Sequence, residues 1–385
     1  MAHGRSGRAG IIGLMRYRLL GRSGLRVSEV ALGTMTFSDR DLSWGASPAE
    51  SRAIFDAFAE AGGTFVDTAN IYGDAVDGED HASERVLADL LAADREHFVV
   101  ASKWTSSNTR DVSCSGNSFK AMRETVDASL RALRTDHLDL LWLHTWDGTT
   151  AVEEVLRGAA QLVGAGKVLY LGFSDTPAWV VSHAGALADA RGWPPPIAIQ
   201  VEYSLAQRTV EQELLSMAQA LDLGVCAWSP LAGGLLTGKY AERAERAGGR
   251  LEDAGFRATA GDAHAGPEEV VAVLGGVAAE LGVPAAQVAL AWLRSRPGVV
   301  IPILGARRAE QLRGNLEAVQ LELGPEHRAR LDDATTPALG FPHGFPVLPD
   351  GAPLQHLRAL RRAPQPPRPP LRRVSRPELA IDNGS

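Results

Sequence analysis

Short apolar runs alternate with amphipathic stretches along most of the chain. The apolar runs are rich in β-branched residues and lead into turn residues, which is typical of buried strands. The stretches between them carry helix-start signals such as Ser47-Pro48 and stop signals such as Gly62-Gly63. The predicted strands are 27–35, 64–69, 97–103, 138–144, 168–173, 197–203, 224–229 and 299–304. The predicted helices are 48–61, 82–93, 118–134, 151–165, 177–190, 210–221, 268–281, 285–295 and 308–319.

Strict alternation of strand and helix predicts a parallel sheet with right-handed crossovers. The strand at 138–144 is nearly all apolar, as expected when both of its faces are buried. Eight such units over about 300 residues favour an α/β fold of the (β/α)8 TIM barrel type over an open sheet. An open sheet would also show a glycine-rich phosphate turn after an early strand, whereas Gly62-Gly63 precedes its strand. A further short helix at 326–334 is expected outside the barrel.

Three segments differ in composition. Residues 1–15 fit no element, so we expect a disordered extension, with Met15 as a candidate translation start. Residues 16–350 are expected to form a single barrel domain. Residues 351–385 carry seven prolines, seven arginines and only two acidic residues, which predicts a disordered tail.

Composition narrows the class of protein. A hydrophobic content of 45% supports a sizeable core, and the net charge of −7 argues against nucleic-acid binding by the whole chain. No apolar run approaches the ~20 residues that span a bilayer, so no membrane association is expected. The two cysteines, Cys114 and Cys226, give neither a disulfide framework nor a metal-binding spacing. The expected location is therefore the reducing cytoplasm.

Four polar residues lie at or just after the ends of three successive strands. Asp67 ends the strand at 64–69, Tyr72 lies in the loop after it, Lys103 ends the next strand and His144 ends the third. Catalytic groups of a barrel lie at this carboxyl-terminal face. Tyrosine, with a pKa of about 10, is a poor proton donor near neutrality, but a neighbouring ammonium lowers that pKa and a carboxylate holds the ammonium in place. The set thus predicts a proton-transfer site, with Tyr72 as general acid.

These four residues, in this order, resemble the catalytic tetrad of the aldo-keto reductases. The resemblance covers roughly residues 16–335. It implies an NADPH-dependent oxidoreductase that reduces the aldehyde or ketone group of a small-molecule substrate to an alcohol by hydride transfer. In that reading Lys103 tunes Tyr72, Asp67 pairs with Lys103, and His144 orients the carbonyl oxygen.

The resemblance also implies the nicotinamide contacts. Ser174-Asp175 stands where the family carries a Ser-Asn-like pair that binds the carboxamide; Asp175 departs from that pattern, because a carboxylate accepts hydrogen bonds but cannot donate them. Gln200 matches the family glutamine at the same group. The segment 227–239 is the most specific match, and Trp228 would stack on the nicotinamide ring. With tryptophan instead of tyrosine at this position, the chain resembles the branch of the family that includes aryl-alcohol dehydrogenases and potassium-channel β subunits.

The segment 301–315 resembles the adenosine end of the family's cofactor site. Arg307 aligns with the position that grips the 2′-phosphate, which favours NADPH, while Gln311 and Asn315 match adenine-side contacts. Backbone N–H groups at the start of this helix also favour an anion. The implied cofactor is NADPH/NADP+, and no metal is expected. The full set of implied cofactor-binding residues is Gly33, Thr34, Met35, Asp67, Ser174, Asp175, Gln200, Trp228, Ser229, Pro230, Leu231, Gly233, Lys239, Gly305, Arg307, Gln311 and Asn315.

Two other functions are weighed against this one. A regulatory barrel that binds NADPH but turns over little would resemble the channel β subunits, although the intact tetrad argues against it. A metal-dependent hydrolase would need paired histidines or a carboxylate–histidine cluster, and the histidines here do not pair in that way. The sequence leaves the oligomeric state open.

The substrate is the least determined part. Specificity should come from the loops at 36–46, 104–117, 145–149 and 233–267. Trp44, Trp104 and Trp146 lie in these loops and would form an aromatic pocket suited to aryl or long aliphatic aldehydes, unless they pack in the core. Sugars, quinones and steroids also remain open.

Overall fold

Eight parallel strands close into a barrel in the order β10-β3-β4-β5-β6-β7-β8-β9, which confirms the predicted (β/α)8 TIM barrel. The computed structural model describes residues 15–39, 45–73, 80–108, 111–238, 267–338 and 340. The barrel strands are β3 (Ala31–Gly33), β4 (Phe65–Asp67), β5 (Val99–Trp104), β6 (Leu138–Leu143), β7 (Val168–Ser174), β8 (Pro196–Glu202), β9 (Gly224–Trp228) and β10 (Val300–Leu304).

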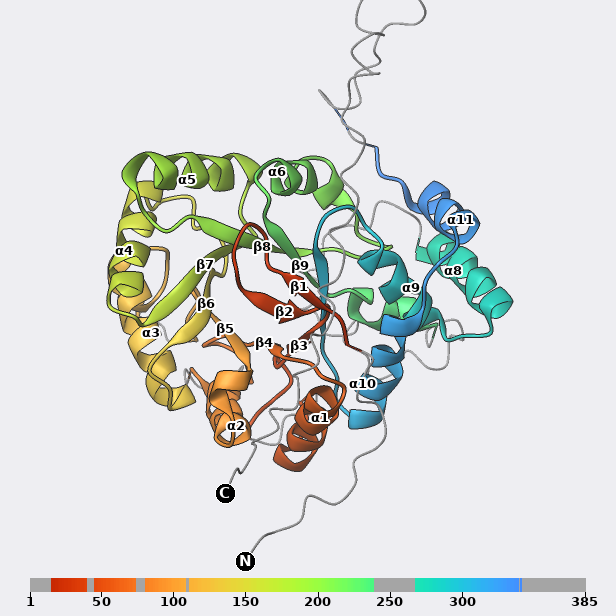
Figure 1. Cartoon of the computed structure of the whole chain (residues 1–385), viewed down its shortest axis with the longest axis horizontal. Helices are drawn as coiled ribbons and strands as arrows, with labels where there is room; N and C mark the ends of the chain where they lie inside the picture. Colours follow the sequence, from red (N-terminus) through yellow and green to blue (C-terminus); the bar gives the residue numbers. More distant parts are fainter. Residues whose placement is uncertain are drawn as a thin grey trace, which may run out of the picture.

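The helices form an outer ring around the strands (Figure 1). They are α1 (Pro48–Glu60), α2 (Ala82–Leu91), α3 (Phe119–Leu133), α4 (Val152–Gly164), α5 (Ala178–Arg191), α6 (Leu214–Ala220), α8 (Pro267–Leu281), α9 (Ala285–Arg294), α10 (Ala309–Leu316) and α11 (Pro325–Thr335). Short 3-10 turns are η1 (Arg95–His97), η2 (Val112–Cys114), η3 (Thr209–Glu211), η4 (Ala232–Thr237) and η7 (Glu317–Gln320). As expected, α11 lies outside the ring, packed on α8.

The apolar core has two layers. One fills the barrel interior, and the other lies between the strands and the surrounding helices. Trp142 is the largest side chain of the inner layer. It packs over Gly172 on the neighbouring strand, where an added Cβ would lie 2.3 Å from its ring. Glycine at this position therefore makes room for the tryptophan that fills the barrel.

The predicted first strand at 27–35 is wrong, because the structure divides it into two elements. β1 (Tyr17–Leu19) and β2 (Arg26–Ser28) form an antiparallel hairpin that crosses the amino-terminal end of the barrel, and only β3 enters the ring (Figure 1). Leu20 and Val27 of this hairpin join the inner apolar layer.

Side-chain hydrogen bonds and salt bridges interrupt the predicted strand between β2 and β3. The Ser28 hydroxyl donates to the Val30 carbonyl at 2.7 Å and accepts from the Thr64 N–H at 3.1 Å. The next residue, Glu29, is buried and forms salt bridges with Arg16 at 3.1 Å and Arg294 at 2.5 Å. These contacts replace the strand ladder and turn the chain from the hairpin into the barrel.

The predicted helix at 210–221 is also shorter than expected. The structure has the turn η3 followed by α6, which spans only seven residues. Glu211 points inward, where its carboxylate accepts from the Tyr203 hydroxyl at 2.7 Å and from the Arg208 guanidinium at 2.8 Å. This inward bonding holds 209–211 as a separate turn.

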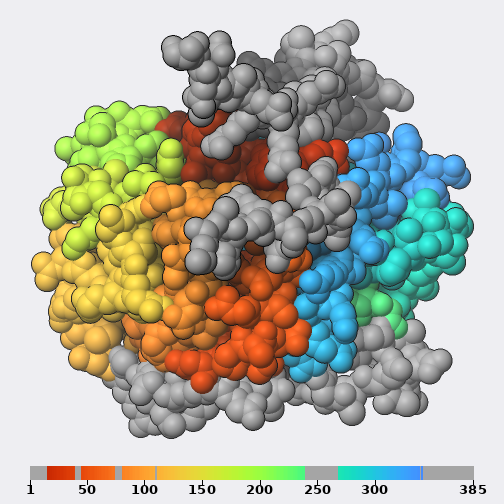
Figure 2. All heavy atoms as spheres, turned by 60° about the horizontal axis from the view of Figure 1, so that its bottom comes forward, coloured from red at the N-terminus to blue at the C-terminus, as the bar shows by residue number. Residues whose placement is uncertain are grey.

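The ring closes where the first barrel strand meets the last. β10 pairs with β3 through Ile303 opposite Ala31 and Leu304 opposite Leu32. Outside this seam, α1 and α10 lie side by side on the surface (Figure 2). The Glu50 carboxylate of α1 accepts a hydrogen bond from the Ala309 N–H of α10 at 2.6 Å.

Some expectations fall outside the described residues. These are the predicted extension apart from Met15, the tail at 351–385, and the single residues Trp44 and Lys239. Within the described ranges, no single helix is long and apolar enough to cross a membrane; α8 and α9 pass that test only as a pair bent by 98°.

Candidate active site

The carboxyl ends of β4, β5 and β6 bring the predicted tetrad together. Asp67 is the last residue of β4, Lys103 lies one residue before the end of β5, and His144 directly follows β6. Lys103 is fully buried, and its ammonium donates to Asp67 Oδ2 at 2.6 Å and to the Thr68 carbonyl at 2.8 Å. Neighbouring parallel strands thus deliver an ion pair to the floor of the barrel mouth.

Tyr72 reaches this ion pair from the loop after β4. Its ring centroid lies 4.5 Å from Lys103 Nζ and 5.8 Å from the centroid of the His144 ring, edge to face. The loop turns at Gly73, which has φ +77°, and a Cβ there would lie 2.0 Å from the Phe37 carbonyl oxygen. Only glycine fits this turn, which fixes the position of Tyr72.

The ion pair and the tyrosine set each other's protonation. Burial alone would lower the pKa of Lys103, but the Asp67 carboxylate and Tyr72 outweigh burial, so that its pKa lies above the ordinary value. Burial raises the pKa of Tyr72, and the opposing effect of Lys103 is smaller. Lys103 thus lowers the pKa of Tyr72, as expected, but burial outweighs this effect and the net shift is upward. Tyr72 carries its proton at neutral pH.

His144 is a neutral imidazole. Burial, together with the nearby Lys103 charge, lowers its pKa to about 3. Its Nδ1 is buried without a hydrogen-bond partner among the described residues, and its backbone N–H donates to the Trp104 carbonyl at 3.0 Å. A neutral imidazole has one donor and one acceptor nitrogen, so it can bind an oxygen atom without bringing a second positive charge.

The first turn of α2 supports the tetrad from behind, which the sequence did not indicate. The Ser102 hydroxyl, next to Lys103, donates to Glu84 Oε1 at 2.5 Å, and Glu84 Oε2 lies 2.5 Å from His81 Nδ1. Glu84 is completely buried. In the sequence these residues look like an ordinary polar helix start, so only the three-dimensional contacts identify them.

Gln200 connects the tetrad to the predicted carboxamide site. Its Nε2 donates to Asp67 Oδ1 at 2.8 Å. The carboxylate can only accept, so the amide NH2 faces Asp67 and the amide oxygen is directed elsewhere. On the adjacent strand β7, the Ser174 hydroxyl is buried and has no partner among the described residues. A buried hydroxyl in this state is suited to a ligand carbonyl or amide.

Asp175 and Trp228 lie beside this hydroxyl at the mouth. Trp228 Nε1 donates to Asp175 Oδ1 at 3.0 Å, and Asp175 adopts a left-handed backbone with φ +41°. The residue as a whole is exposed, but its carboxyl group is largely removed from water. This desolvation raises the pKa of the carboxyl to about 6, against the opposing hydrogen bond from Trp228.

Glu202 is a second acid here that the sequence analysis missed. It ends β8 and lies opposite Trp228 in the strand register. Burial, with a smaller contribution from the Asp175 charge, raises its pKa to about 7. The sequence spacing could have identified Glu202, because Gln200 and Glu202 are two residues apart on one strand and therefore face the same side.

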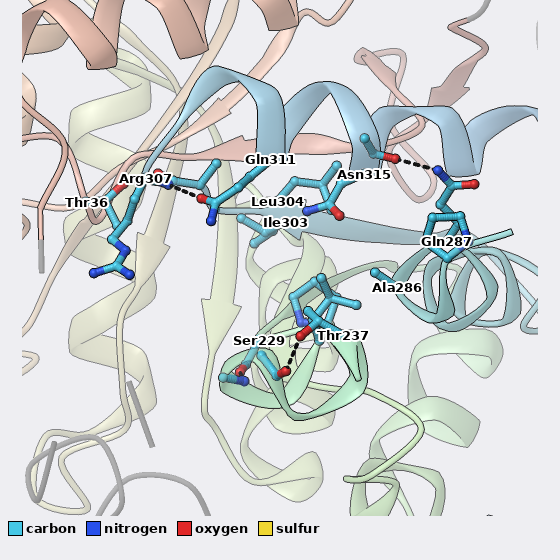
Figure 3. A pocket seen from close by; sticks show the side chains of 18 of the residues that line it. Thr36, Ser229, Thr237, Ala286, Gln287, Ile303, Leu304, Arg307, Gln311 and Asn315 are labelled. Atoms are coloured by element: carbon cyan, nitrogen blue, oxygen red, sulfur yellow. Dashed lines mark hydrogen bonds between the residues drawn. The ribbon is translucent and has the colours of Figure 1, made fainter. Parts of the chain in front are cut away.

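A cavity of about 710 Å³ extends from β9 to α10. Gln311 and Asn315 project from α10 above the floor of Ile303 and Leu304, facing Ser229 and Thr237 across the cavity (Figure 3). The predicted cofactor residues that line it are Ser229, Pro230, Leu231, Gly233, Gly305, Arg307, Gln311 and Asn315. Unpredicted lining residues include Thr36, Thr237, Gln287 and Glu310.

The start of α10 is already partly occupied. The Arg307 N–H donates to the Gln311 side-chain oxygen at 3.1 Å, and the Ala309 N–H donates to Glu50. The Arg307 side chain itself is exposed and extends away from the helix (Figure 3). The helix start expected to favour an anion thus already holds one carboxylate from the protein.

The remaining predicted residues differ in what they offer a ligand. Gly33, Thr34 and Met35 form the end of β3 and the residues after it, but the Thr34 hydroxyl is engaged with the Asp67 carbonyl at 3.2 Å. Trp104 has no exposed surface, so its assignment to an open substrate pocket is wrong: its ring packs in the outer apolar layer. Trp146 is only partly buried against that layer.

The donor set fits a nicotinamide dinucleotide. No three His, Cys, Asp or Glu side chains are grouped for metal binding in the described part of the chain. The unpartnered Ser174 hydroxyl, the Trp228 ring and the cavity beside α10 lie on or next to the consecutive barrel strands β7 to β10.

Comparison with known proteins agrees with this geometry. The model of the aldo/keto reductase family matches residues 29–336. An aryl-alcohol dehydrogenase (NADP+) from Phanerodontia chrysosporium is 36% identical over 340 residues, which is 83% of this chain and 86% of that protein. A norsolorinic acid reductase from Aspergillus flavus is 35% identical, with 86% and 83% covered. A putative aryl-alcohol dehydrogenase from Saccharomyces cerevisiae is 32% identical, with 86% and 89% covered. Matched over most of its length, this chain belongs to the aldo/keto reductase family of oxidoreductases.

Proposed function

We propose that the protein reduces aldehydes or ketones to alcohols with NADPH, using Tyr72 as the general acid. The observation that carries this proposal is the buried Lys103 ammonium, 2.6 Å from Asp67 Oδ2 and 4.5 Å from the centre of the Tyr72 ring. When bound, the reduced nicotinamide supplies a hydride to the carbonyl carbon. The protein must then supply a proton to the carbonyl oxygen.

Tyr72 and Lys103 share this task. Tyr72 is protonated at neutral pH, so the donor is present before reaction. As its proton leaves, the adjacent ammonium of the fully buried Lys103 stabilises the growing phenolate charge. Asp67 keeps Lys103 charged and in place. The neutral His144 binds and orients the same carbonyl oxygen.

The residues over β7 to β10 would hold the cofactor. Ser174 and Gln200 would bind the carboxamide, Trp228 would stack on the ring, and Arg307 would pair with the 2′-phosphate. The name of the relative from Phanerodontia chrysosporium supports both NADP+ and an aryl alcohol or aldehyde as the substrate class.

Rapid mixing tests this function directly. Purified protein is loaded with NADPH and mixed with 4-nitrobenzaldehyde, and cofactor oxidation is followed by absorbance. We expect oxidation of the bound cofactor within one turnover, followed by steady turnover. Bound NADPH that is not oxidised by a panel of carbonyl compounds would instead favour a regulatory barrel that holds the cofactor.

A further inference from the structure

Asp175 places a negative charge at the nicotinamide end of the site. It directly follows β7, and its Oδ1 accepts the Trp228 Nε1–H at 3.0 Å. This bond fixes the carboxylate at the edge of the indole ring.

Glu202 approaches the same tryptophan from another strand. It pairs with Trp228 in the β8–β9 register, and it shares the inward face of β8 with Gln200, whose amide reaches Asp67 inside the barrel. The two acids are close enough that the Asp175 charge contributes to the raised pKa of Glu202. Trp228 is therefore flanked by two carboxyl groups.

We propose that Asp175 and Glu202 act together as a charge sensor for the nicotinamide, so that the cationic ring of NADP+ binds more tightly than the neutral ring of NADPH. This inference rests on the proposed function, because it takes the nicotinamide to stack on Trp228. A hydrogen bond from the carboxamide NH2 to Asp175 is available in both oxidation states. Only the ring charge differs between them, so the Coulomb attraction alone makes the distinction.

Among the described residues, Lys103 is the cation that acts on Asp175, and its charge opposes this field. Lys103 on β5 is paired with Asp67 on β4 at 2.6 Å, which reduces that opposition. His144 after β6 is neutral, and Tyr72 keeps its proton. Among the described residues at this mouth, Asp175 and Glu202 have raised pKa values, of about 6 and about 7, so both change charge between pH 5 and 8.

The expected pH dependence follows from that titration. Both carboxyls lose protons as the pH rises, so the preference for NADP+ should increase with pH. The 2′-phosphate also titrates near pH 6, but it is common to both cofactors. The ratio of the two dissociation constants removes its contribution, and that ratio is therefore the quantity to measure.

Calorimetric titration of the full chain with NADP+ and with NADPH, from pH 5 to pH 8.5, provides the test. In the unmodified protein, the ratio of Kd for NADPH to Kd for NADP+ should rise at least about fivefold, equivalent to the ~1 kcal/mol of two charges 4 Å apart even in water. In Asp175→Asn the ratio should lose most of this rise. In Glu202→Gln the ratio should keep only the part of its rise that occurs near pH 6.

A matched control removes an acid from the same face of the barrel. Glu153 is exposed in the first turn of α4, so Glu153→Gln should keep the full rise of the ratio. If Asp175→Asn weakens both cofactors by the same factor at every pH, Asp175 only shapes the site and the inference is wrong. A pH-independent ratio in the unmodified protein refutes the inference alone. Failure to bind either cofactor refutes the proposed function and, with it, the inference.

Discussion

The two ends of the candidate site, at the tetrad and at the start of α10, hold their charges in opposite ways. At the tetrad end, Lys103 has no exposed surface, and its ammonium is bonded to Asp67 and to a backbone carbonyl. At the α10 end, the Arg307 side chain is exposed, and the helix start is shared with a carboxylate from α1.

This difference separates chemistry from recognition. Removing one partner of a buried ion pair leaves the other uncompensated, so at the tetrad end a substitution affects both stability and turnover. An exposed charge contributes little to folding, so at the α10 end a substitution should change only the affinity for a ligand. Substitutions at each end can therefore show whether the two roles are distinct.

The largest effect is expected for Tyr72→Phe, which keeps the ring and removes the proton donor. Turnover of 4-nitrobenzaldehyde with NADPH should fall by about 10²–10⁴-fold, as is usual for a general acid. Cofactor affinity should be unchanged, because no cofactor contact is assigned to Tyr72. Lys103→Met acts on the same proton, so the double variant should lose less than the product of the two single losses. Retention of more than about a tenth of kcat would move the proton donor to His144 or a bound water.

Asp67→Asn should show how the tetrad end couples catalysis to folding. It leaves the buried Lys103 without its charge partner, so the free energy of unfolding in urea at pH 7 should fall by about 3–5 kcal/mol. Asp127→Asn is the control, since it breaks the partly exposed 2.6 Å pair with Lys167 and should cost less than about 1 kcal/mol. Equal losses for the two variants would contradict the contrast between buried and exposed pairs.

Arg307→Ala tests recognition at the α10 end. Loss of a charge-assisted bond to the 2′-phosphate should weaken NADPH by roughly 10- to 150-fold, corresponding to about 1.5–3 kcal/mol. NADH lacks that phosphate, so its affinity should hardly change, and the melting temperature should also be retained. Arg308→Ala is the matched control, because Arg308 is exposed but does not line the cavity. An equal loss for NADH and NADPH would remove Arg307 from the phosphate site.

The smallest expected effect is an increase in the affinity for NADPH. Glu50→Gln keeps an oxygen acceptor for the Ala309 N–H but removes the negative charge at the start of α10. A 2′-phosphate near this helix end should then bind about 2- to 5-fold more tightly, from the ~0.3–1 kcal/mol typical of a charge at a helix terminus. The measurement is the ratio of NADPH to NADH affinity. An unchanged ratio would show that the phosphate lies beyond the reach of Glu50.

The sequence predicts those features that depend on local patterns. The ring of strands is predicted by short apolar runs that alternate with amphipathic stretches, and the tetrad is predicted by the polar residues at the ends of those runs. The division of 27–35 could not be predicted this way, because it depends on Ser28 bonding to Thr64, 36 residues away. The helix contact of Glu50 with Ala309 spans 259 residues. The pKa values of Tyr72 and Glu202 likewise depend on burial, which only the assembled barrel determines.

The seam between β10 and β3 bears on how the protein is made. β4 to β6, with the tetrad residues, leave the ribosome well before β10 and α10 are synthesised. An incomplete chain therefore carries the acid–base residues but lacks most of the cavity beside α10. A ligand stabilises only the form that binds it, so cofactor would protect finished molecules and leave truncated ones to proteolysis.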